Sequence, residues 1–450
     1  MLFDSLVLSR HADARRRYLS IMEAALAAVD PYQAVRARLH RRGDELWIDG
    51  QMYDLSRFRR ILVVGAGKAG APMVRAVEDT LGESITAGLV VVKTGHAAPT
   101  SRVEIVEATH PIPNQAGLDA GQRILTQLAD AGADDLVLVL VSGGGSALLE
   151  APAGLTLAEL QATTDALLAC GATINEINTL RKHLSLVKGG QLARVASPAT
   201  LVTLVLSDVV GSPLDVIASG PTAPDLSTWD DAWAVVTKYE LAPRLPAAVL
   251  ARLQAGIRGA LPDTPKPDDP IFATARTVIV GDNRVAALAG CQHATALGYR
   301  SLLLTTFVEG EACEVAKVVA ALAKEVRRSG QPVAPPACLI LGGETTVTLG
   351  VQPGHGGRNQ ELALAAALAL EGMAGVAVAA LATDGSDGPT DSAGGLIDGE
   401  TVARGRAAGL YAVVALRRHD AYPYLRATGD LLLTGPTQTN VNDLIFVWVE

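Results

Sequence analysis

The sequence predicts an α/β protein in which parallel strands are covered by helices on both faces. Short runs rich in valine and leucine recur along the chain, end in glycine or polar residues, and are mostly followed by helical periodicity. Hydrophobic residues make up 49% of the chain and aromatic residues only 4%, which suits strands buried on both faces. Because 450 residues exceed what one core usually organises, we expect two or three domains.

Charge and hydropathy exclude several classes of protein. The net charge of −9 argues against binding to nucleic acid or an anionic membrane, so an anionic substrate would need local basic residues. The longest apolar stretch, 361–383, is interrupted by Glu371 and Gly372 and predicts a helix followed by a strand. The four cysteines are far apart and show no metal or disulfide pattern. The start of the sequence lacks the order of a secretion signal, and we expect a soluble cytoplasmic protein.

The first elements are a helix, a hairpin and a strand with a glycine turn. Residues 11–29 predict an amphipathic surface helix, and Asp49-Gly50 marks the turn of a small hairpin. The stretch ILVVGAGKAG, 61–70, then predicts a strand, a glycine turn and a helix. Such a turn leaves backbone N–H groups available to hold an anion, and this one carries a lysine, Lys68.

The glycine turn matches the G-x-G-x-x-G pattern of dinucleotide-binding proteins at three positions, Gly65, Gly67 and Gly70. That pattern also needs an acidic residue at the end of the next strand, where this chain has Lys93 and Thr94. Since Lys68 is followed by alanine, the turn is not a Walker A loop either. Two interpretations remain: an anion-binding turn with an inward lysine, or a tight turn with a solvated lysine.

A second glycine loop follows the strand predicted within DDLVLVLVSGGGSALLE, 134–150. It contains Ser142, Gly143, Gly144, Gly145 and Ser146. Consecutive glycines cost conformational entropy, so close approach of the backbone to a phosphate is the best explanation. A merely flexible loop is the alternative.

The segment INEINTLRKHLSLVKGGQLA, 174–193, concentrates basic residues in an acidic chain. Its candidates for holding an anionic substrate are Arg181, Lys182, Ser185 and Lys188. A solvated basic helix face explains the composition about as well.

Carboxylates follow two of the predicted strands. Asp208 ends the strand of TLVTLVLSD, and Asp384 and Asp387 follow the strand of VAVAALATD. Carboxylates at strand ends beside glycine loops are typical magnesium ligands. The second group could instead cap the turn or orient basic residues, and it lacks the EF-hand pattern.

The proline-rich segment 263–270 predicts a boundary between domains at 1–262 and 271–450. In the second half, Arg358 lies near a helix N-terminus, where the helix dipole disfavours a cation. This placement hints at function, with pairing to Glu344 or Glu361 as the alternative. Asn440 and Asn442 lie in the turn between the last two predicted strands, where they could bind a polar substrate or satisfy the turn backbone.

Eight segments together carry a resemblance to a known family. They are VVGAGKAG, LVSGGGSALLE, INEINTLRKHLSLVKGGQLA, LSDVVGSPLDVIASGPT, GGETTVTL, GHGGRNQE, ATDGSDGPTD and TGPTQTNVNDL. In this order, over nearly the whole chain, they resemble the glycerate 2-kinases of the MOFRL type, some of which carry the older label hydroxypyruvate reductase.

The resemblance implies an N-terminal Rossmann-like parallel sheet and a C-terminal domain with a MOFRL-type region at about 337–450. The active site would lie in the cleft between the two domains. It implies transfer of phosphate from ATP to the 2-hydroxyl of D-glycerate, with Mg²⁺, and Lys68 and Arg358 as the catalytic pair. The glycine loops would hold nucleotide phosphates, the basic cluster and Asn440 and Asn442 the substrate, and Asp208 or the 384–391 loop the metal.

Two alternatives remain. An NAD(P)H-dependent hydroxypyruvate reductase would need a nicotinamide site, and the missing acid after the second strand speaks against it. A non-catalytic anion-binding protein could use the glycine loops, but would not need several strand-end carboxylates. The sequence leaves the nucleotide preference and the oligomeric state open, a homodimer included.

Overall fold

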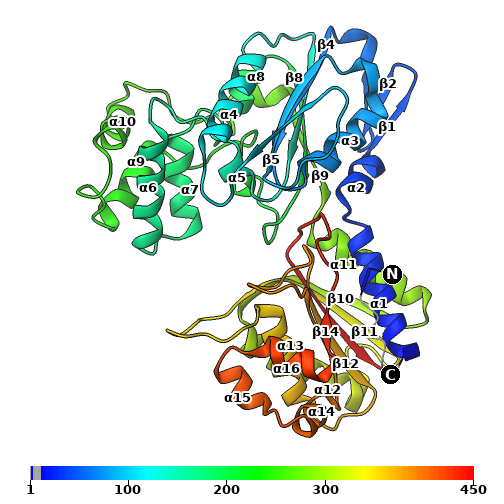
Figure 1. The fold of residues 1–450 in the computed structure, drawn as a ribbon. Helices are drawn as coiled ribbons and strands as arrows, with labels where there is room; N and C mark the ends of the chain where they lie inside the picture. The colour runs from blue at the N-terminus through cyan, green and yellow to red at the C-terminus, as the bar shows by residue number, and fades with distance from the viewer. Residues whose placement is uncertain (1, 4–11) are drawn as a thin grey trace. The chain divides into compact units, whose positions relative to one another are not determined.

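A computed structural model describes residues 2–3 and 12–450. The chain divides into two compact units (Figure 1). The N-terminal unit is Pro31–Val280, and the C-terminal unit consists of residues 12–30 with Gly281–Glu450.

This division differs from the predicted boundary at 263–270. That segment belongs to the N-terminal unit, where the Thr264 hydroxyl donates to Asp225 at 2.9 Å, and β9 (Ala275–Gly281) follows it at the edge of the unit's large sheet. Residues 12–30 join the C-terminal unit instead. The proline-rich stretch is therefore a connection within the N-terminal unit and does not coincide with the division between the two units.

The N-terminal unit is built on a six-stranded sheet of order β6-β5-β4-β7-β8-β9, and β6, β5, β4, β7 and β8 are parallel neighbours. These strands are β4 (Arg60–Ala66), β5 (Ala87–Lys93), β6 (Glu104–Ala108), β7 (Asp135–Val141) and β8 (Thr200–Leu206). The predicted Rossmann-like parallel sheet is confirmed. Because parallel strands present their carboxyl ends at one edge, the loops after β4, β7 and β8 lie on the same side.

Helices cover both faces of this sheet. On one face lies α3 (Gly70–Leu81), whose Gly70 packs against Val90 and Val92. On the other face, α4 (Gln115–Leu128) and α8 (Gln191–Ala196) pack on the alternate side chains of the strands. The short helices α2 (Pro31–Arg38), α5 (Gly145–Leu148), η2 (Leu55–Arg57), η3 (Gly82–Ser84), η4 (Ile217–Ser219) and η5 (Pro270–Thr274) complete the connections.

Two smaller elements of the N-terminal unit were partly predicted. A three-stranded sheet of β1 (Leu39–Arg42), β2 (Glu45–Ile48) and β3 (Gln51–Asp54) contains the predicted hairpin, whose turn residues Asp49 and Gly50 both have positive φ. A helical group with its own core comprises α6 (Leu157–Ala169), α7 (Ile174–His183), α9 (Trp229–Lys238) and α10 (Ala247–Ile257). Thr156 begins α6 with a capping box, a Thr-x-x-Glu pattern that is visible in the sequence.

The C-terminal unit has a six-stranded sheet of order β10-β11-β15-β12-β13-β14. Its strands are β10 (Arg300–Glu311), β11 (Ala337–Thr346), β12 (Val376–Ala382), β13 (Gly394–Asp398), β14 (Leu431–Leu432) and β15 (Asp443–Val449). Only β10 and β11 pair in parallel; β15 lies between β11 and β12 and is antiparallel to both. The expectation of parallel strands is wrong for this sheet. Consecutive parallel strands need a crossover connection, usually a helix, whereas β12 and β13 are joined without a helix and pair antiparallel.

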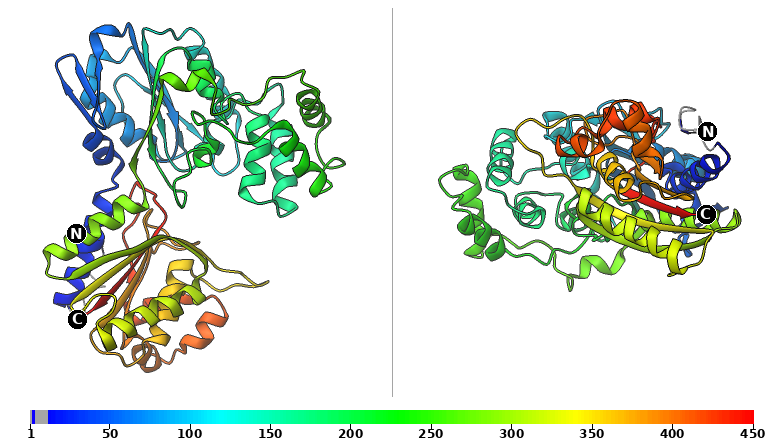
Figure 2. Two further views of the ribbon diagram at one scale, coloured as in Figure 1. Left: turned by 180° about the vertical axis from the view of Figure 1, so that it is seen from behind. Right: turned by 90° about the horizontal axis from the view of Figure 1, so that it is seen from below.

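The two faces of this sheet carry different helices (Figure 2). Side chains such as Leu339 and Val447 pack against α12 (Ala312–Ser329) and α13 (Arg358–Ala369). The alternate residues, Ile340 and Phe446, face α11 (Asn283–Ala296). The remaining helices are α14 (Thr401–Ala407), α15 (Ala412–Arg417) and α16 (Ala421–Thr428). In the described part of the chain, none of the helices combines the length and apolarity needed to cross a bilayer.

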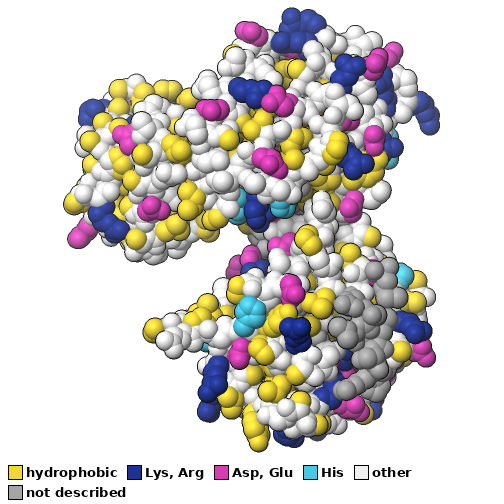
Figure 3. All heavy atoms as spheres, in the orientation of Figure 1, with side chains coloured by type: hydrophobic (Ala, Val, Ile, Leu, Met, Phe, Trp, Pro, Cys, Tyr) yellow, Lys and Arg dark blue, Asp and Glu magenta, His cyan; other side chains and the backbone are white. Residues whose placement is uncertain are grey.

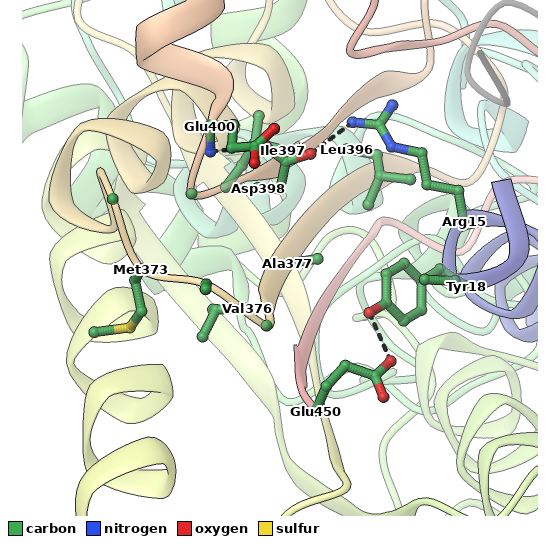
Figure 4. Close-up of a pocket in the computed structure, with 15 residues that line it drawn as sticks. Arg15, Tyr18, Met373, Val376, Ala377, Leu396, Ile397, Asp398, Glu400 and Glu450 are labelled. Carbon is green, nitrogen blue, oxygen red and sulfur yellow. Dashed lines mark hydrogen bonds and ion pairs between the residues drawn. The ribbon is translucent and has the colours of Figure 1, made fainter. Parts of the chain in front are cut away.

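The first helix, α1 (Ala12–Ala27), is not the surface helix that the sequence predicted. Tyr18 stacks on Trp448 with ring centroids 4.3 Å apart, and its hydroxyl donates to Glu450 at 2.9 Å. Figure 4 shows Arg15 and Tyr18 beside a cavity of about 310 Å³, with Arg15 pointing toward Asp398. The basic side of the helix is therefore partly buried against the sheet of its own unit.

We expect Asp430→Ala to lower the free energy of unfolding by about 3–5 kcal/mol, because it removes the fully buried carboxylate that the guanidinium groups of Arg15 and Arg404 share. The fully buried Asp430 accepts from Arg15 at 2.6 Å and from Arg404 at 2.8 Å. Chemical denaturation would measure the change. Asp13→Ala, which removes an exposed ion pair with Arg16 on the same helix, should change it by less than about 1 kcal/mol. If Asp430→Ala and Asp13→Ala changed the free energy of unfolding equally, the proposed importance of burial would be contradicted.

Candidate active site

The loop after β4 is shaped by close backbone contacts with the end of β7. A Cβ on Gly65 would lie 2.0 Å from the Leu140 carbonyl oxygen, and one on Gly67 would lie 2.0 Å from the Ser142 Oγ. Both residues have φ near +150°, which side chains disfavour. Glycine is required here so that the two loops can touch.

The N–H groups of this loop are already used within the protein. Gly67 donates to the Val91 carbonyl at 3.0 Å, Lys68 to the Gly143 carbonyl at 2.8 Å, and the N–H of residue 69 to the Ser142 hydroxyl at 3.0 Å. The prediction that these N–H groups hold an anion is therefore wrong. Gly65 and Gly67 serve to pack the loop, and the side chain of Lys68 is what the loop presents.

The Lys68 side chain lies over the triglycine loop. Its Cε is 3.4 Å from the point where a Cβ on Gly144 would lie, and the His110 ring is 3.0 Å from the same point. Within the described residues, the Lys68 ammonium takes part in no hydrogen bond or ion pair. A half-buried cation without a carboxylate is a ready ligand for an anion.

The triglycine loop differs from the first loop in its backbone N–H groups. Those of Gly143 and Gly144 donate to no acceptor in the described parts of the protein. Gly144 has φ +80° and lies in the left-handed region. A Cβ on Gly143 would lie 2.2 Å from Asp208 Oδ2, so the predicted metal ligand after β8 does lie against this loop. Gly145 differs from these two residues, because its N–H donates to the Ser142 carbonyl oxygen at 3.2 Å.

A chain of polar side chains leads from the triglycine loop into α7. The Ser146 and Ser219 hydroxyls are 2.7 Å apart, and Ser219 donates to Asn178 at 3.0 Å. Arg181 approaches Ser146 at 3.5 Å, and its buried Nε has no hydrogen-bond partner among the described residues. Burial lowers the pKa of Arg181, and Glu150 opposes that shift. A buried guanidinium with an unsatisfied N–H is suited to an anionic ligand.

Three predicted substrate ligands have structural roles instead. Lys182 is 4% exposed and pairs with Asp215 and Asp225, each at 3.2 Å. Lys188 is buried and pairs with Glu150 at 2.7 Å. Ser185 accepts from the N–H of Lys188 at 3.3 Å within the same buried turn. These predictions are corrected, because sequence composition does not reveal which cations already have internal partners.

In the C-terminal unit, Arg358 begins α13 and binds two carboxylates. Its Nη2 donates to Asp443 Oδ1 at 3.0 Å, its Nε donates to the other oxygen, and its Nη1 lies 2.9 Å from Glu344. Burial, opposed by Arg358, raises the pKa of Asp443 to about 7, and nearby Asp387 adds to the rise. The alternative that Arg358 pairs with Glu344 is therefore correct. A pocket of about 410 Å³ lies beside Arg358, lined by Val347, Pro353, Pro389 and His419 among others.

Asp387, a predicted metal ligand, caps α13. Its Oδ1 accepts from the N–H of Asn359 at 3.1 Å and its Oδ2 from the N–H of Gln360 at 2.8 Å. With both oxygens bound to the helix, Asp387 is a capping residue, which is one of the roles that the sequence left open. Asp384 forms a local turn, accepting from the N–H of Ser386 at 3.0 Å.

The two asparagines lie near the start of β15. Asn440 Oδ1 accepts from the N–H of Asn442 at 3.2 Å, and Asn442 donates to Glu344 at 2.8 Å. Asn442 has φ +66° and is buried. Both therefore shape the turn, and Asn442 also orients the carboxylate that binds Arg358.

Comparison with known proteins identifies the family. Residues 17–254 match a domain described as a domain of unknown function (DUF4147), and residues 337–443 match the MOFRL family. The glycerate 2-kinase of Pyrococcus horikoshii is 38% identical over 97% of this chain and 98% of its own. The crystal structure of a glycerate kinase from Thermotoga maritima is similar with a TM-score of 0.87 and 39% identity, covering 97% of this chain and 100% of that chain. The chain belongs to the MOFRL-type glycerate 2-kinase family.

The older label persists among members of this family. A putative hydroxypyruvate reductase of Agrobacterium vitis is 42% identical over 96% of this chain and 93% of its own. The resemblance drawn from the eight sequence segments is thus confirmed. A glycerate 2-kinase fold of two α/β units agrees with the predicted class.

Two residues received no role from the sequence, although Asp443 lies within the last of the eight resembling segments. Asp443 holds Arg358, and a signal was available: it is an acidic residue directly before the apolar run of β15. His110 lies over the triglycine loop, and it follows β6 as the other candidates follow their strands. For the described residues, no three His, Cys, Asp or Glu side chains gather as a metal cluster.

Proposed function

We propose that the protein is an ATP-dependent glycerate kinase that phosphorylates the 2-hydroxyl of D-glycerate to give 2-phosphoglycerate. The similarity to glycerate kinases over nearly the whole chain supports the reaction. The observation that carries the site is the Lys68 ammonium, which lies over the triglycine loop without an internal partner in the described chain. A kinase uses ATP as the phosphoryl donor, so this cation would face phosphate oxygens.

In the proposed mechanism, the N-terminal unit would bind anions through groups that have no ion-pair partner among the described residues. Lys68 and the N–H groups of Gly143 and Gly144 would bind phosphate oxygens. Arg181, steered by Ser146, would bind the carboxylate of glycerate. Phosphoryl transfer depends mainly on such positioning and on stabilising charge as the γ-phosphoryl group passes in line to the hydroxyl.

Arg358 would stabilise negative charge on the transferring phosphoryl group. Its guanidinium is two-thirds buried and is held by Asp443 and Glu344, so its orientation is set before any ligand binds. Preorganised donors avoid reorganisation during the reaction, which is the main source of electrostatic catalysis.

Magnesium is proposed as the cofactor, because kinases usually bind it through substrate phosphates and one or two carboxylates. Asp208 fits this need, since its Oδ2 lies against the loop that would bind phosphates. Asp384 is a second candidate, whereas Asp387 does not fit because both of its oxygens cap α13. When bound, the ion would neutralise charge on the phosphates.

Asp208→Asn should raise the magnesium concentration needed for half-maximal activity by about tenfold or more, because it removes one anionic ligand. A magnesium titration of initial rates at saturating ATP would measure the change. Asp387→Asn is the matched control, and it should lower stability without shifting the magnesium dependence. An unchanged titration for Asp208→Asn would remove this residue from the proposed metal site.

The decisive experiment measures ADP formation with ATP, magnesium and either D- or L-glycerate. We expect ADP only with D-glycerate, and 2-phosphoglycerate rather than 3-phosphoglycerate as the product. If the protein forms no ADP in response to glycerate, the proposal is wrong. The same protein should consume no NADH or NADPH with hydroxypyruvate, since β5 ends in Lys93 where a nicotinamide site needs an acid.

A further inference from the structure

Three basic side chains meet at the carboxyl ends of neighbouring strands in the N-terminal unit. Lys68 follows β4, Lys93 is the last residue of β5, and His110 lies just beyond β6. The register pairs Lys93 with Ala108, the last residue of β6, which places Lys93 and the start of the His110 segment side by side. In the space-filling view, histidine and Lys/Arg side chains likewise adjoin on the surface of this unit (Figure 3).

The His110 ring is directed at the triglycine loop. A Cβ on Gly144 would lie 3.0 Å from its Cδ2, 3.2 Å from its Nε2 and 3.4 Å from Lys68 Cε. The ring and the lysine therefore close over the same point of the backbone. Throughout residues 12–450, neither Lys68, Lys93 nor His110 has a side-chain hydrogen bond or an ion pair with a carboxylate.

The charge around His110 is one-sided. Burial, then Lys68 and then Lys93, lower the pKa of His110 to about 4, so the ring is neutral at neutral pH in the protein without ligand. In the loop after β7, the ring lies beside the uncharged Gly144. Asp208, after β8, lies against the neighbouring Gly143, and His96, after β5, contacts the Lys68 carbonyl oxygen at 3.1 Å.

We propose that Lys93 and His110 join Lys68 as ligands of a phosphate group of the nucleotide, and that His110 takes up a proton from solvent when this phosphate binds. The inference rests on the proposed function and specifies where its phosphates bind. A phosphate dianion placed among these groups would offset the charge of both lysines and reverse the electrostatics at the ring. The proton taken from solvent forms a second N–H bond on the imidazole, which can then donate from Nε2 to a phosphate oxygen while the bonds of the nucleotide stay unchanged.

Calorimetric titration of the full chain with ADP, and separately with inorganic tripolyphosphate, tests this proposal without turnover. Each titration is run near pH 7.5 in two buffers that differ in ionisation enthalpy, so that proton uptake can be calculated. We expect net uptake of up to one proton by the unmodified protein. His110→Gln should abolish the proton uptake that is due to the protein. It should also weaken binding by about tenfold or more, as expected for a lost charge-assisted hydrogen bond.

Two further variants separate the contributions. Lys93→Met should also weaken binding by about tenfold or more and reduce the salt dependence, since it removes a cation. His40→Gln changes an exposed histidine of β1 in a separate sheet, and it should leave affinity and proton uptake unchanged.

The outcomes distinguish this site from the proposed function as a whole. Unaltered affinity and proton uptake in His110→Gln would overturn the assignment even if the protein phosphorylates glycerate. The same holds if the variant weakens glycerate binding but not that of ADP or tripolyphosphate, because the site would then bind a carboxylate. Conversely, the protein could bind tripolyphosphate with the expected proton uptake and yet form no ADP in response to glycerate. That result would support the phosphate site and reject the proposed kinase activity.

Discussion

Lys68→Ala should lower kcat for glycerate phosphorylation by about 10²–10³-fold, the effect typical of removing one preorganised group that stabilises transition-state charge. The fold should survive, because the Lys68 ammonium has no internal partner in the described structure and its loop is held by backbone bonds. Steady-state kinetics and a thermal unfolding curve would measure the two effects together.

Lys68→Arg is the matched control for charge. It keeps the cation but changes its shape, and it should recover only part of the lost rate if the position of the charge matters. A folded Lys68→Ala protein with a normal kcat would exclude the proposed catalytic role. A change confined to the KM for ATP would assign Lys68 to ground-state binding instead.

Arg358→Ala should lower kcat by about 10³–10⁵-fold, the range measured for arginines that stabilise a transferring phosphoryl group. The same change has a structural cost, because the buried Asp443 loses its bidentate partner. Breaking such a pair typically costs about 3–5 kcal/mol, and partial exposure of Arg358 should bring the cost toward the lower end.

The double variant Arg358→Ala with Asp443→Asn separates catalysis from stability. Removing the charge of Asp443 should restore most of the stability but none of the rate. The stability of the single variant should also depend on pH, because burial raises the pKa of Asp443 in the folded protein. The free energy of unfolding should fall as the pH rises from about 4, the ordinary pKa of an aspartate, to about 7 or above. Over this range the carboxyl ionises more readily in the unfolded chain than in the folded protein. Recovery of kcat in the double variant would show that Arg358 acts only through the fold.

The sequence predicted those features that depend on short-range backbone requirements. Glycines after β4 and β7 were found because only glycine permits the close contacts seen at Gly67 and Gly144. The Asp49-Gly50 turn follows local backbone rules in the same way. The strand ends, and with them the loops that carry Lys68, Asp208 and Arg358, were therefore in the right places.

Features that depend on partners distant in sequence could not be predicted. Lys182 and Arg181 are neighbours on α7, yet one has two internal carboxylates and the other has an unsatisfied Nε. No local pattern distinguishes them, because Asp215 and Asp225 come from a different loop. The burial of Arg15 has the same cause, since its partner Asp430 lies more than 400 residues away along the chain.

The place of β15 bears on how the chain folds as it is synthesised. The N-terminal unit is one continuous stretch and can form its sheet soon after Val280 leaves the ribosome. The other unit cannot, because β15 (443–449) lies between β11 and β12 in its sheet, and α1 packs on this strand, which is translated more than 400 residues later. Until then, the facing edges of β11 and β12 would be open to pairing with other chains, so nascent protein should depend on chaperones chiefly for this late-closing sheet.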